Sequence, residues 1–284
     1  MNANSPLPLS IKDWVADATR QLVFAEIPSA RLDAELILAH TLRQPRHYLH
    51  AHDDEMLTER DLEIANARIA LRLDRVPVAY IIGHKEFYGR RFRVTTATLI
   101  PRPESEVLIE LLEQAVPKNL ALLGNQLKLI DVGTGSGALG ITAKLQHPEV
   151  DVTLADISRH ALNIAEQNAR SLKAEVTVLQ SDLLASFPFI ADIIVANLPY
   201  VDPAWERSPE TEHEPASALF AANEGKAFIF ELIAQTKDRL AIGGYMILEA
   251  DPEQHPAIIE YAKHHGFLLQ EAKEYGILLQ KLSA

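Results

Sequence analysis

The sequence contains no cysteine among its 284 residues. This absence excludes a disulfide framework, a zinc–thiolate site and a cysteine nucleophile. No apolar stretch reaches the roughly 18 residues that a membrane span needs. The opening MNANSPLPLSIKDW lacks a charged segment followed by an apolar core, so we expect no signal peptide. We therefore expect a cytoplasmic protein that has no contact with a membrane.

Positive charge is scarce, with 27 Lys and Arg against 39 Asp and Glu and a net charge of -12. An acidic surface repels phosphate, so we expect no direct binding of nucleic acid. The 11 histidines do not cluster at metal-ligand spacing, which argues against a metal site. A content of 48% hydrophobic and 23% charged residues is ordinary for a folded globular chain. The length suits one large domain with a small one.

Glycine is missing from residues 1–75, whose apolar residues recur at helical spacing. Ser10 can cap the first of these helices, Pro28 and Ser29 restart the chain before the second, and Thr58–Asp61 marks the start of a third. The pattern predicts a small helical bundle over residues 1–75, with Trp14 in its core.

The residue composition changes at Val76. Residues 86–100 are rich in aromatic and β-branched side chains around Gly89, which predicts a β-hairpin within a linker over residues 76–106. A helix over Glu104–Gln114 should follow.

Residues 107–284 alternate between strand and helix patterns, which predicts an α/β fold with a mostly parallel sheet covered on both faces. The last two strands are joined too tightly for a crossover helix, so the final strand should be antiparallel. The expected strands are Leu127–Val132, Val152–Ala155, Val176–Gln180, Ile193–Ala196, Tyr245–Glu249, Phe267–Ala272 and Ile277–Lys281, with helices such as Ala161–Leu172 and Lys226–Leu240 between the first five.

A glycine-rich segment, DVGTGSG, follows the first of these strands and opens a helix. Its glycines let the backbone turn sharply and approach a ligand closely, although a tight turn packed for its own sake is the alternative. The spacing matches neither a P-loop nor GxGxxG. Asp131 precedes the loop, where a carboxylate suits an amino or cationic group better than a pyrophosphate. These features favour S-adenosylmethionine (SAM), which has no phosphate, over NAD.

Polar residues also end the next two strands. Asp156 stands about 20 residues after the loop, where a carboxylate can hold a ribose diol. Asp182 stands where a polar side chain can meet an adenine amino group. For both, the alternative is a helix cap. The candidate cofactor-binding residues of this region are Asp131, Gly133, Thr134, Gly135, Gly137, Asp156, Ile157, Asp182 and Leu183.

The fourth strand ends in Asn197-Leu198-Pro199-Tyr200. Ligands of open parallel sheets bind outside the carboxyl ends of the strands, so Asn197 should stand beside the glycine loop. Its side-chain oxygen and the Leu198 carbonyl can accept hydrogen bonds from a planar NH2 group, while Pro199 stiffens the turn and Tyr200 offers a flat face. These four are the candidate catalytic residues. The alternative is a turn that Asn197 caps and Tyr200 packs against.

At these residues the chain resembles the HemK/PrmC protein-(glutamine-N5) methyltransferases. The similarity extends over nearly the whole chain, and LIPRPESE at residues 99–106 is its most specific segment. Further segments that carry it are RLDAELILAH at 31–40, PVAY at 77–80, EFYG at 86–89, the glycine loop, NLPY at 197–200, and Glu214-Pro215 with Ala218, Leu219 and Gly225. Two residues depart from the family pattern, since Leu198 replaces its usual proline and Ser105 its usual threonine.

The resemblance implies a Rossmann-like SAM-dependent methyltransferase domain over residues 107–284, with S-adenosyl-L-homocysteine as a product. It implies methyl transfer to the glutamine N5 of the Gly-Gly-Gln motif in peptide chain release factors. By the same resemblance, Asn197, Pro199, Tyr200 and Leu99 would bind the substrate, and Arg102 and Ser105 would border the cofactor. The bundle over residues 1–75 would dock the release factor, and we expect a monomer.

Other functions stay open at this point. Glutamine methylation of a ribosomal protein would use the same chemistry. Adenine-N6 methylation of ribosomal RNA also needs a site for a planar NH2 group, but the charge balance argues against it. A chain of this fold that only binds a partner is a further alternative. Arg102 has the alternative of a surface ion pair with Glu104 or Glu106.

Overall fold

The computed structural model describes residues 9–123 and 127–283, and of residues 117–123 it describes the backbone alone. The described chain forms two compact units. The helical unit comprises the described residues up to Gly83 together with Ser208–His213. The sheet unit comprises His84–Arg207 and the described residues from Glu214 on.

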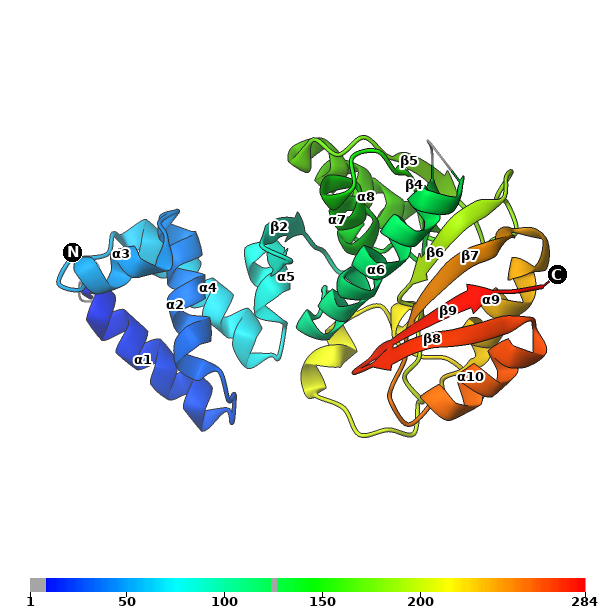
Figure 1. Cartoon of the computed structure of the whole chain (residues 1–284). Coiled ribbons are helices and arrows are strands. Elements are labelled where there is room, and N and C mark those ends of the chain that lie inside the picture. The colour runs from blue at the N-terminus through cyan, green and yellow to red at the C-terminus, as the bar shows by residue number, and fades with distance from the viewer. Residues whose placement is uncertain (1–8, 124–126, 284) are drawn as a thin grey trace, which may run out of the picture. The chain divides into compact units, whose positions relative to one another are not determined.

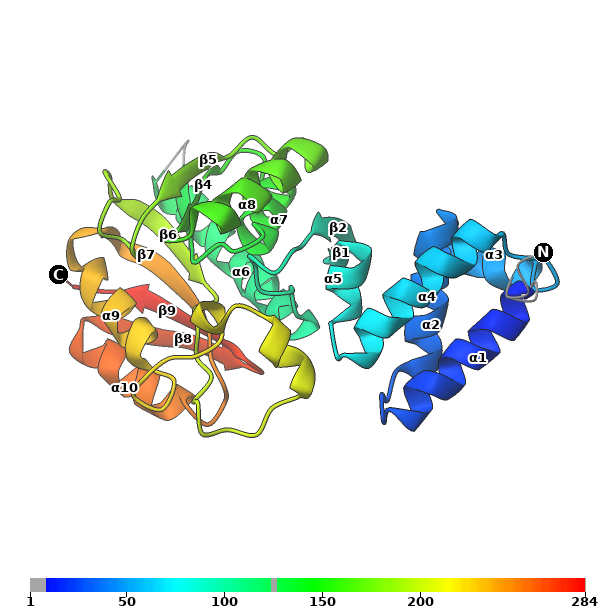
Figure 2. The same ribbon diagram turned by 180° about the vertical axis from the view of Figure 1, so that it is seen from behind.

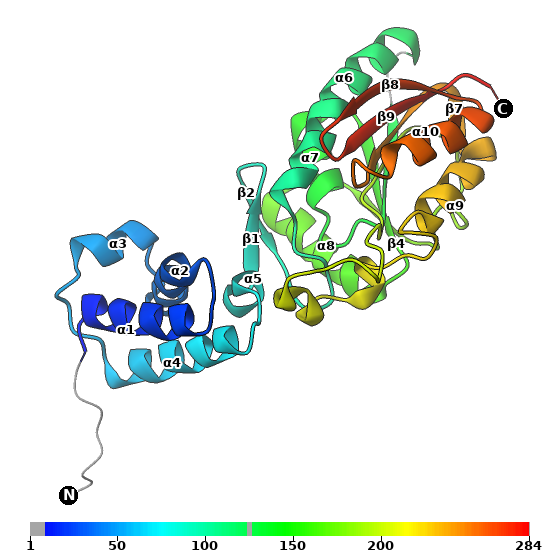
Figure 3. The ribbon, with the colours of Figure 1, turned by 90° about the horizontal axis from the view of Figure 1, so that it is seen from below.

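The helical unit contains α1 (Ile11–Phe24), α2 (Ala30–Leu42), α3 (Arg46–Ala51), α4 (Glu59–Leu73) and α5 (Val78–Ile82). Helix α2 packs against both α1 and α4 (Figure 3). The predicted cap at Ser10 is confirmed, because its hydroxyl accepts a hydrogen bond from the backbone N–H three residues later, and Thr58 caps α4 in the same way. Trp14 is 2% exposed, as predicted, and its ring N–H donates to Asn66.

A short segment from far along the chain completes the helical unit. Ser208–His213 contains a 3-10 helix over Pro209–His213. Glu210 accepts a hydrogen bond from Arg72 of α4 at 2.9 Å, and Arg72 also donates to Asp33 of α2 at 2.7 Å. His213 lies 2.8 Å from the Asp74 carbonyl. The polar contacts of Glu210 and His213 thus fasten the segment to the end of α4.

The sheet unit begins with a two-stranded hairpin, β1 (His84–Phe87) and β2 (Arg90–Arg93), which turns at Gly89. The predicted hairpin is confirmed, but its predicted extent, to Ile100, is wrong. Residues 94–100 leave the hairpin because Thr95 starts a turn, in which its carbonyl accepts from the Thr98 N–H at 3.0 Å. The 3-10 helix Pro103–Ser105 and α6 (Glu106–Leu123) follow.

A seven-stranded sheet forms the rest of the unit, in the order β5-β4-β3-β6-β7-β9-β8. The final strand of the chain, β9, lies between β7 and β8 and pairs antiparallel with both, as predicted (Figure 1). The strands are β3 (Lys128–Val132), β4 (Asp151–Asp156), β5 (Thr177–Gln180), β6 (Ala191–Ala196), β7 (Leu240–Glu249), β8 (Phe267–Lys273) and β9 (Gly276–Lys281).

Alternating side chains of this sheet fill two apolar cores. Helices α6, α7 (Ala138–Gln146) and α8 (Arg159–Leu172) cover one face, and α9 (Ala227–Gln235) and α10 (His255–His264) cover the other (Figures 1 and 2). Helix α9 is shorter than the predicted Lys226–Leu240, because the chain continues as a 3-10 helix over Thr236–Asp238 and β7 begins at Leu240. The predicted α/β fold with one antiparallel strand is therefore confirmed, and its parallel strands end at one common edge.

Candidate functional site

A pocket of about 570 Å³ opens at the carboxyl ends of β3, β4, β5 and β6. Its wall comes from the segments that follow these strands and from residues 96–99, which leave the hairpin. Most of the predicted site residues line it, namely Leu99, Ser105, Gly133, Thr134, Gly135, Asp156, Ile157, Asp182, Leu183, Asn197, Leu198 and Pro199. Asp131, Gly137, Arg102 and Tyr200 lie outside this lining.

The glycine loop owes its course to backbone angles that side chains rarely adopt. Gly133, Gly135 and Gly137 have φ of +71°, +54° and +83°. A Cβ at Gly133 would come 2.8 Å from Cδ2 of Leu198. Leu198 is 4% exposed, so this leucine fills the space directly over the loop. The residue that departs from the family pattern thus packs the glycine loop against the turn after β6.

Asp131 is buried behind the glycine loop and accepts hydrogen bonds from it and from α7. It is 1% exposed, and its Oδ2 accepts hydrogen bonds from the Thr134 hydroxyl at 2.5 Å and the Gly140 N–H at 2.9 Å. Burial raises the pKa of its carboxyl group to about 6, although these two hydrogen bonds oppose the rise. The structure therefore places Asp131 under the loop that borders the pocket.

Asp156, at the end of β4, lies in the pocket wall. One of its oxygens accepts from the Gly135 N–H at 2.9 Å and the other from the Ser158 N–H at 2.8 Å. Burial raises the pKa of this carboxyl group, and the backbone N–H groups oppose the rise. The cap of α8 is Ser158, so the alternative that Asp156 caps a helix is wrong. Asp182 is exposed at the pocket and precedes turns, so it caps no helix either.

Asn197 follows β6 and lines the pocket with Leu198 and Pro199. Its side-chain NH2 donates to the Ser105 hydroxyl oxygen at 3.0 Å. The turn is held at its far end as well, because Gln254 donates to the Tyr200 carbonyl at 2.9 Å. Gly225 packs against that carbonyl so closely that a Cβ there would lie 1.9 Å from it. The candidate acceptors at residues 197 and 198 therefore belong to a turn that is fixed at both ends.

Tyr200 lies behind the turn, and its hydroxyl donates to Glu249 at the end of β7, at 3.1 Å. Burial and the neighbouring Glu249 carboxylate raise the pKa of the tyrosine, so its hydroxyl stays protonated. The structure thus places Tyr200 as a hydrogen-bond donor to a buried carboxylate.

Arg102 pairs with neither Glu104 nor Glu106, so that alternative is wrong. Its guanidinium group contacts Glu214, whose side chain is 2% exposed. The second oxygen of Glu214 accepts from the Ile100 N–H at 3.1 Å. One buried carboxylate therefore holds the segment that carries Leu99 and Pro101 into the pocket wall.

Several residues of the site were not predicted. Phe87 lines the pocket from β1 of the hairpin, residues 96–98 line it because the chain has left the hairpin there, and Phe228 lines it from the start of α9. Their position depends on tertiary packing, and no local sequence pattern predicts it. Glu249 is different, because it is an acidic residue that ends an apolar strand. The signal that marks Asp131 and Asp156 would have found it.

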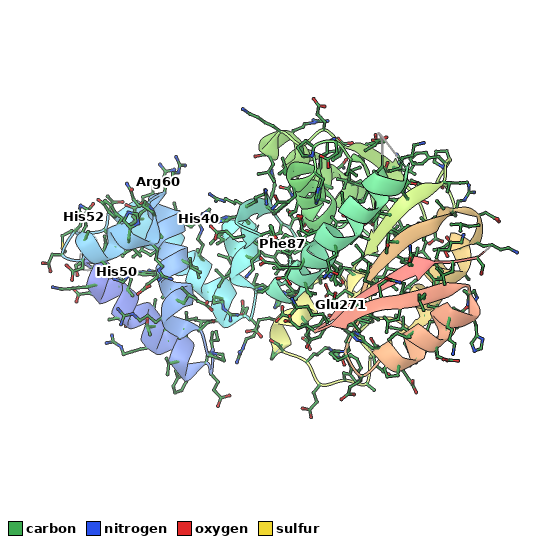
Figure 4. All side chains as sticks on the ribbon, in the orientation of Figure 1. His40, His50, His52, Arg60, Phe87 and Glu271 are labelled. Atoms are coloured by element: carbon green, nitrogen blue, oxygen red, sulfur yellow. The ribbon has the colours of Figure 1, made fainter. Side chains whose placement is uncertain are left out.

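Within residues 9–123 and 127–283, no group of three or more His, Asp or Glu side chains could hold a metal ion. In the helical unit, His40 belongs to α2, whereas His50 and His52 lie at the end of α3 (Figure 4). In the same part of the chain, no helix combines the length and apolar character that a bilayer span requires.

Comparison with known proteins identifies both units. A family model described as PrmC N-terminal domain matches residues 13–83, and one described as Methyltransferase small domain matches residues 103–214. The release factor glutamine methyltransferase of Leptospira interrogans is 39% identical over 260 residues, which cover 89% of each chain. That of Koribacter versatilis is 37% identical over 254 residues, 86% of this chain and 89% of the relative.

Among solved structures, a methyltransferase from Pyrococcus furiosus is similar in fold, with a TM-score of 0.52 at 16% identity over 77% of this chain and 98% of that one. The sequence relatives, at this identity and coverage, carry the assignment. The chain belongs to the release factor glutamine methyltransferase family.

Proposed function

We propose that the protein transfers a methyl group from SAM to the side-chain N5 of the glutamine in the Gly-Gly-Gln motif of peptide chain release factors. The observation that carries the proposal is the Asn197 turn, which lines one pocket with the glycine loop. The relatives' names favour this substrate over a ribosomal protein or ribosomal RNA.

The pocket residues fit SAM. Gly135 lines the pocket without a side chain, and a Cβ there would meet nothing closer than 4.0 Å, so the loop is open to a ligand. Asp156 would hold the ribose diol, since each carboxylate oxygen has a lone pair beyond its backbone contact. Asp182 would face the adenine amino group between Ile157 and Leu183. Bound there, SAM supplies an electrophilic methyl group, and release of a neutral thioether needs no metal ion.

The protein's own contribution is orientation of the substrate nitrogen. The lone pair of an amide nitrogen is delocalised, so the group is a poor nucleophile and ordinary bases do not deprotonate it. The Asn197 side-chain oxygen and the Leu198 carbonyl would accept its two N–H groups and aim the nitrogen at the methyl carbon. The N–CH3 bond forms as the S–CH3 bond of SAM breaks, and the methylated nitrogen releases one proton to water. Leu99 and Pro199 would enclose the glutamine, and Tyr200, which lies outside the pocket lining, would contribute by holding the turn through Glu249. Positioning of this kind accounts for several kcal/mol of a barrier.

We propose a separate role for the helical bundle over residues 1–75, which is to dock the release factor. Residues 76–106 would serve as the linker and residues 107–284 would carry out the chemistry. The match of residues 13–83 to a distinct N-terminal domain supports this division. We propose a monomer that acts in the cytoplasm without direct contact to nucleic acid.

A methyl-transfer assay with labelled SAM tests the function. Purified release factor, its Gly-Gly-Gln→Gly-Gly-Ala version, ribosomal proteins and ribosomal RNA are offered side by side. We expect label on the release factor and none on its alanine version. Label on RNA alone would overturn the proposal and would mean that Leu198 marks a change of substrate.

A further inference from the structure

Glu249 is a buried carboxylate that the proposed reaction leaves without a role. It ends β7 and is 1% exposed. Strands β6 and β7 are parallel neighbours, and Ala196 of β6 pairs with Leu248 of β7. Asn197 and Glu249 are the next residues along these strands, so they lie side by side at the same edge of the sheet. Burying a carboxylate is costly unless neighbouring groups donate hydrogen bonds to it. Its position beside the Asn197 turn therefore needs a reason.

Glu249 lies among three polar side chains, and its Oε2 has no hydrogen-bond partner among the residues that the structure describes. Tyr200 donates its hydroxyl to Glu249 at 3.1 Å, and Asn197 donates its NH2 to the Ser105 hydroxyl oxygen at 3.0 Å. Hydrogen bonding by Ser105, Tyr200 and Asn197 favours the charged form of Glu249 and so opposes the rise of its pKa. An ionised carboxylate can only accept hydrogen bonds, so each of these side chains must turn a donor towards it.

This requirement fixes the Asn197 amide, which otherwise has two nearly isosteric orientations. We propose that Glu249 is a positioning residue, which turns the Asn197 NH2 group towards Ser105 and the protein interior and thereby leaves the Asn197 side-chain oxygen facing the pocket. The inference rests on the proposed function, because only a substrate that donates N–H groups needs an acceptor there. In the opposite orientation, the NH2 of Asn197 would face the NH2 of the glutamine.

Protonation of Glu249 would remove the constraint, because a protonated carboxyl group donates. Ser105 could then accept from Glu249 and donate to the Asn197 oxygen, which would turn the amide away from its productive orientation. Burial raises the pKa of Glu249 above its usual 4.5, and the charge of Glu104 adds to the rise. Tyr200, the other titratable neighbour, stays protonated because its own pKa is raised. The turnover number should therefore fall towards acid pH.

The test uses the full-length chain with Glu249→Gln, which keeps the size of the side chain and removes its charge. Hydrogen bonds to charged groups are the stronger class, so kcat for the release factor should fall about tenfold or more. The Kd for SAM should stay within about twofold, and the acid limb of the kcat profile should disappear. A variant that keeps the wild-type kcat and the same acid limb would overturn the positioning role.

Two further variants separate positioning from a merely structural effect. Glu104→Gln removes a nearby charge without touching the hydrogen bonds, so kcat at neutral pH should not change while the acid limb moves to lower pH. The Glu104→Gln result also tests the proposal if Glu249→Gln does not fold. An acid limb of the kcat profile that does not move in Glu104→Gln would count against the positioning role. Ser105→Ala already removes the hydroxyl that lies between Glu249 and Asn197, so Glu249→Gln should lower kcat several-fold less in this background than in the wild type. An equal fall in kcat in both backgrounds would contradict the proposal.

The outcomes are also distinct from failure of the proposed function. If the wild type does not methylate release factor, both proposals fall. If it does, and the variants behave like it, the positioning role alone is wrong.

Discussion

Replacing Arg72 by methionine removes the cation from the most buried ion cluster of the helical unit. The Arg72 side chain is 5% exposed and lies between Asp33, 7% exposed, and Glu210, 21% exposed. Its distances to their oxygens are 2.7 and 2.9 Å. Methionine keeps the apolar stem and packs in the same space, so the main change is the loss of the charge. Two carboxylates then lie close together without their common partner.

Removing one partner of a buried ion pair costs about 3–5 kcal/mol, because the remaining charge stays buried. Glu210 is partly exposed, so we expect the lower end, about 3 kcal/mol from the unfolding free energy of the helical unit. The matched control is Arg20→Met. Arg20 contacts Asp17 at 2.9 Å, but the two side chains are 74% and 51% exposed. Such a pair contributes at most about 1 kcal/mol.

Urea unfolding measures the difference. The chain has two tryptophans, and Trp14 lies in the core of the helical unit. In a Trp205→Phe background, the fluorescence of Trp14 reports on this unit alone. A loss below about 1 kcal/mol for Arg72→Met, or a loss equal to that of Arg20→Met, would refute the reasoning from burial.

The same cluster predicts a pH dependence. Burial opposes ionisation of Glu210, but hydrogen bonds from Ser208 and its own backbone N–H, and the charge of Arg72, lower the pKa of its carboxyl group to about 2. A carboxyl group with a depressed pKa stabilises the fold above its unfolded pKa, and this contribution is lost as pH falls from about 4.5 towards 2. In Arg72→Met the loss with falling pH should be smaller.

Three further predictions concern the site and its substrate. Asn197→Ala should keep SAM binding by calorimetry but lose most methyl transfer, and undiminished turnover would remove Asn197 from the mechanism. Gly133→Ala should weaken SAM binding and lower stability by about 1–3 kcal/mol, because its Cβ meets Leu198; Leu198→Ala should partly restore both. Deleting residues 1–75 should raise KM for the release factor and leave the Kd for SAM nearly unchanged. Arg72→Met in the full chain keeps the bundle but removes its contact with Glu210. If this variant raises KM as much as the deletion does, loss of that contact explains the rise in KM, and the docking role is not supported.

The sequence alone predicted those parts of the fold that local patterns encode. The cap at Ser10, the helix start at Thr58, the sheet strands and the antiparallel β9 follow from capping chemistry, hydrophobic periodicity and loop length. It did not predict that Ser208–His213 belongs to the helical unit. That contact depends on Arg72 and Glu210, which are 138 residues apart, and no local pattern links them.

The structure brings into one pocket most of the predicted residues that follow a parallel strand, because topology alone brings such residues to one edge. It could not tell which of them would face a ligand. Sequence reasoning also missed the partner of Arg102, because Glu214 lies 112 residues further along the chain and not among its sequence neighbours. Separations of this size are set by the packing of whole elements.

Four adjacent strands of the sheet carry a polar side chain at or next to their carboxyl ends, and burial divides these side chains into two kinds. Asp156 at the end of β4 and Asn197 after β6 line the pocket, whereas Asp131 of β3 and Glu249 of β7 are each 1% exposed and bond to loop or turn groups. The two kinds alternate across the sheet order β4-β3-β6-β7. Asp156 and Asn197 therefore each have a buried carboxylate on a neighbouring strand, whereas the neighbour of Asp182, after β5, is the pocket residue Asp156.

Matched substitutions test this division. Asp131→Asn replaces an acceptor of two hydrogen bonds by a group with its own donors, so it should lower stability by about 1–3 kcal/mol. Asp156→Asn faces the pocket and should weaken SAM binding about tenfold, with a smaller loss of stability. Thermal unfolding and calorimetry on both variants give the comparison. If Asp156→Asn is the less stable and Asp131→Asn the weaker binder, burial does not separate the supporting from the binding carboxylates.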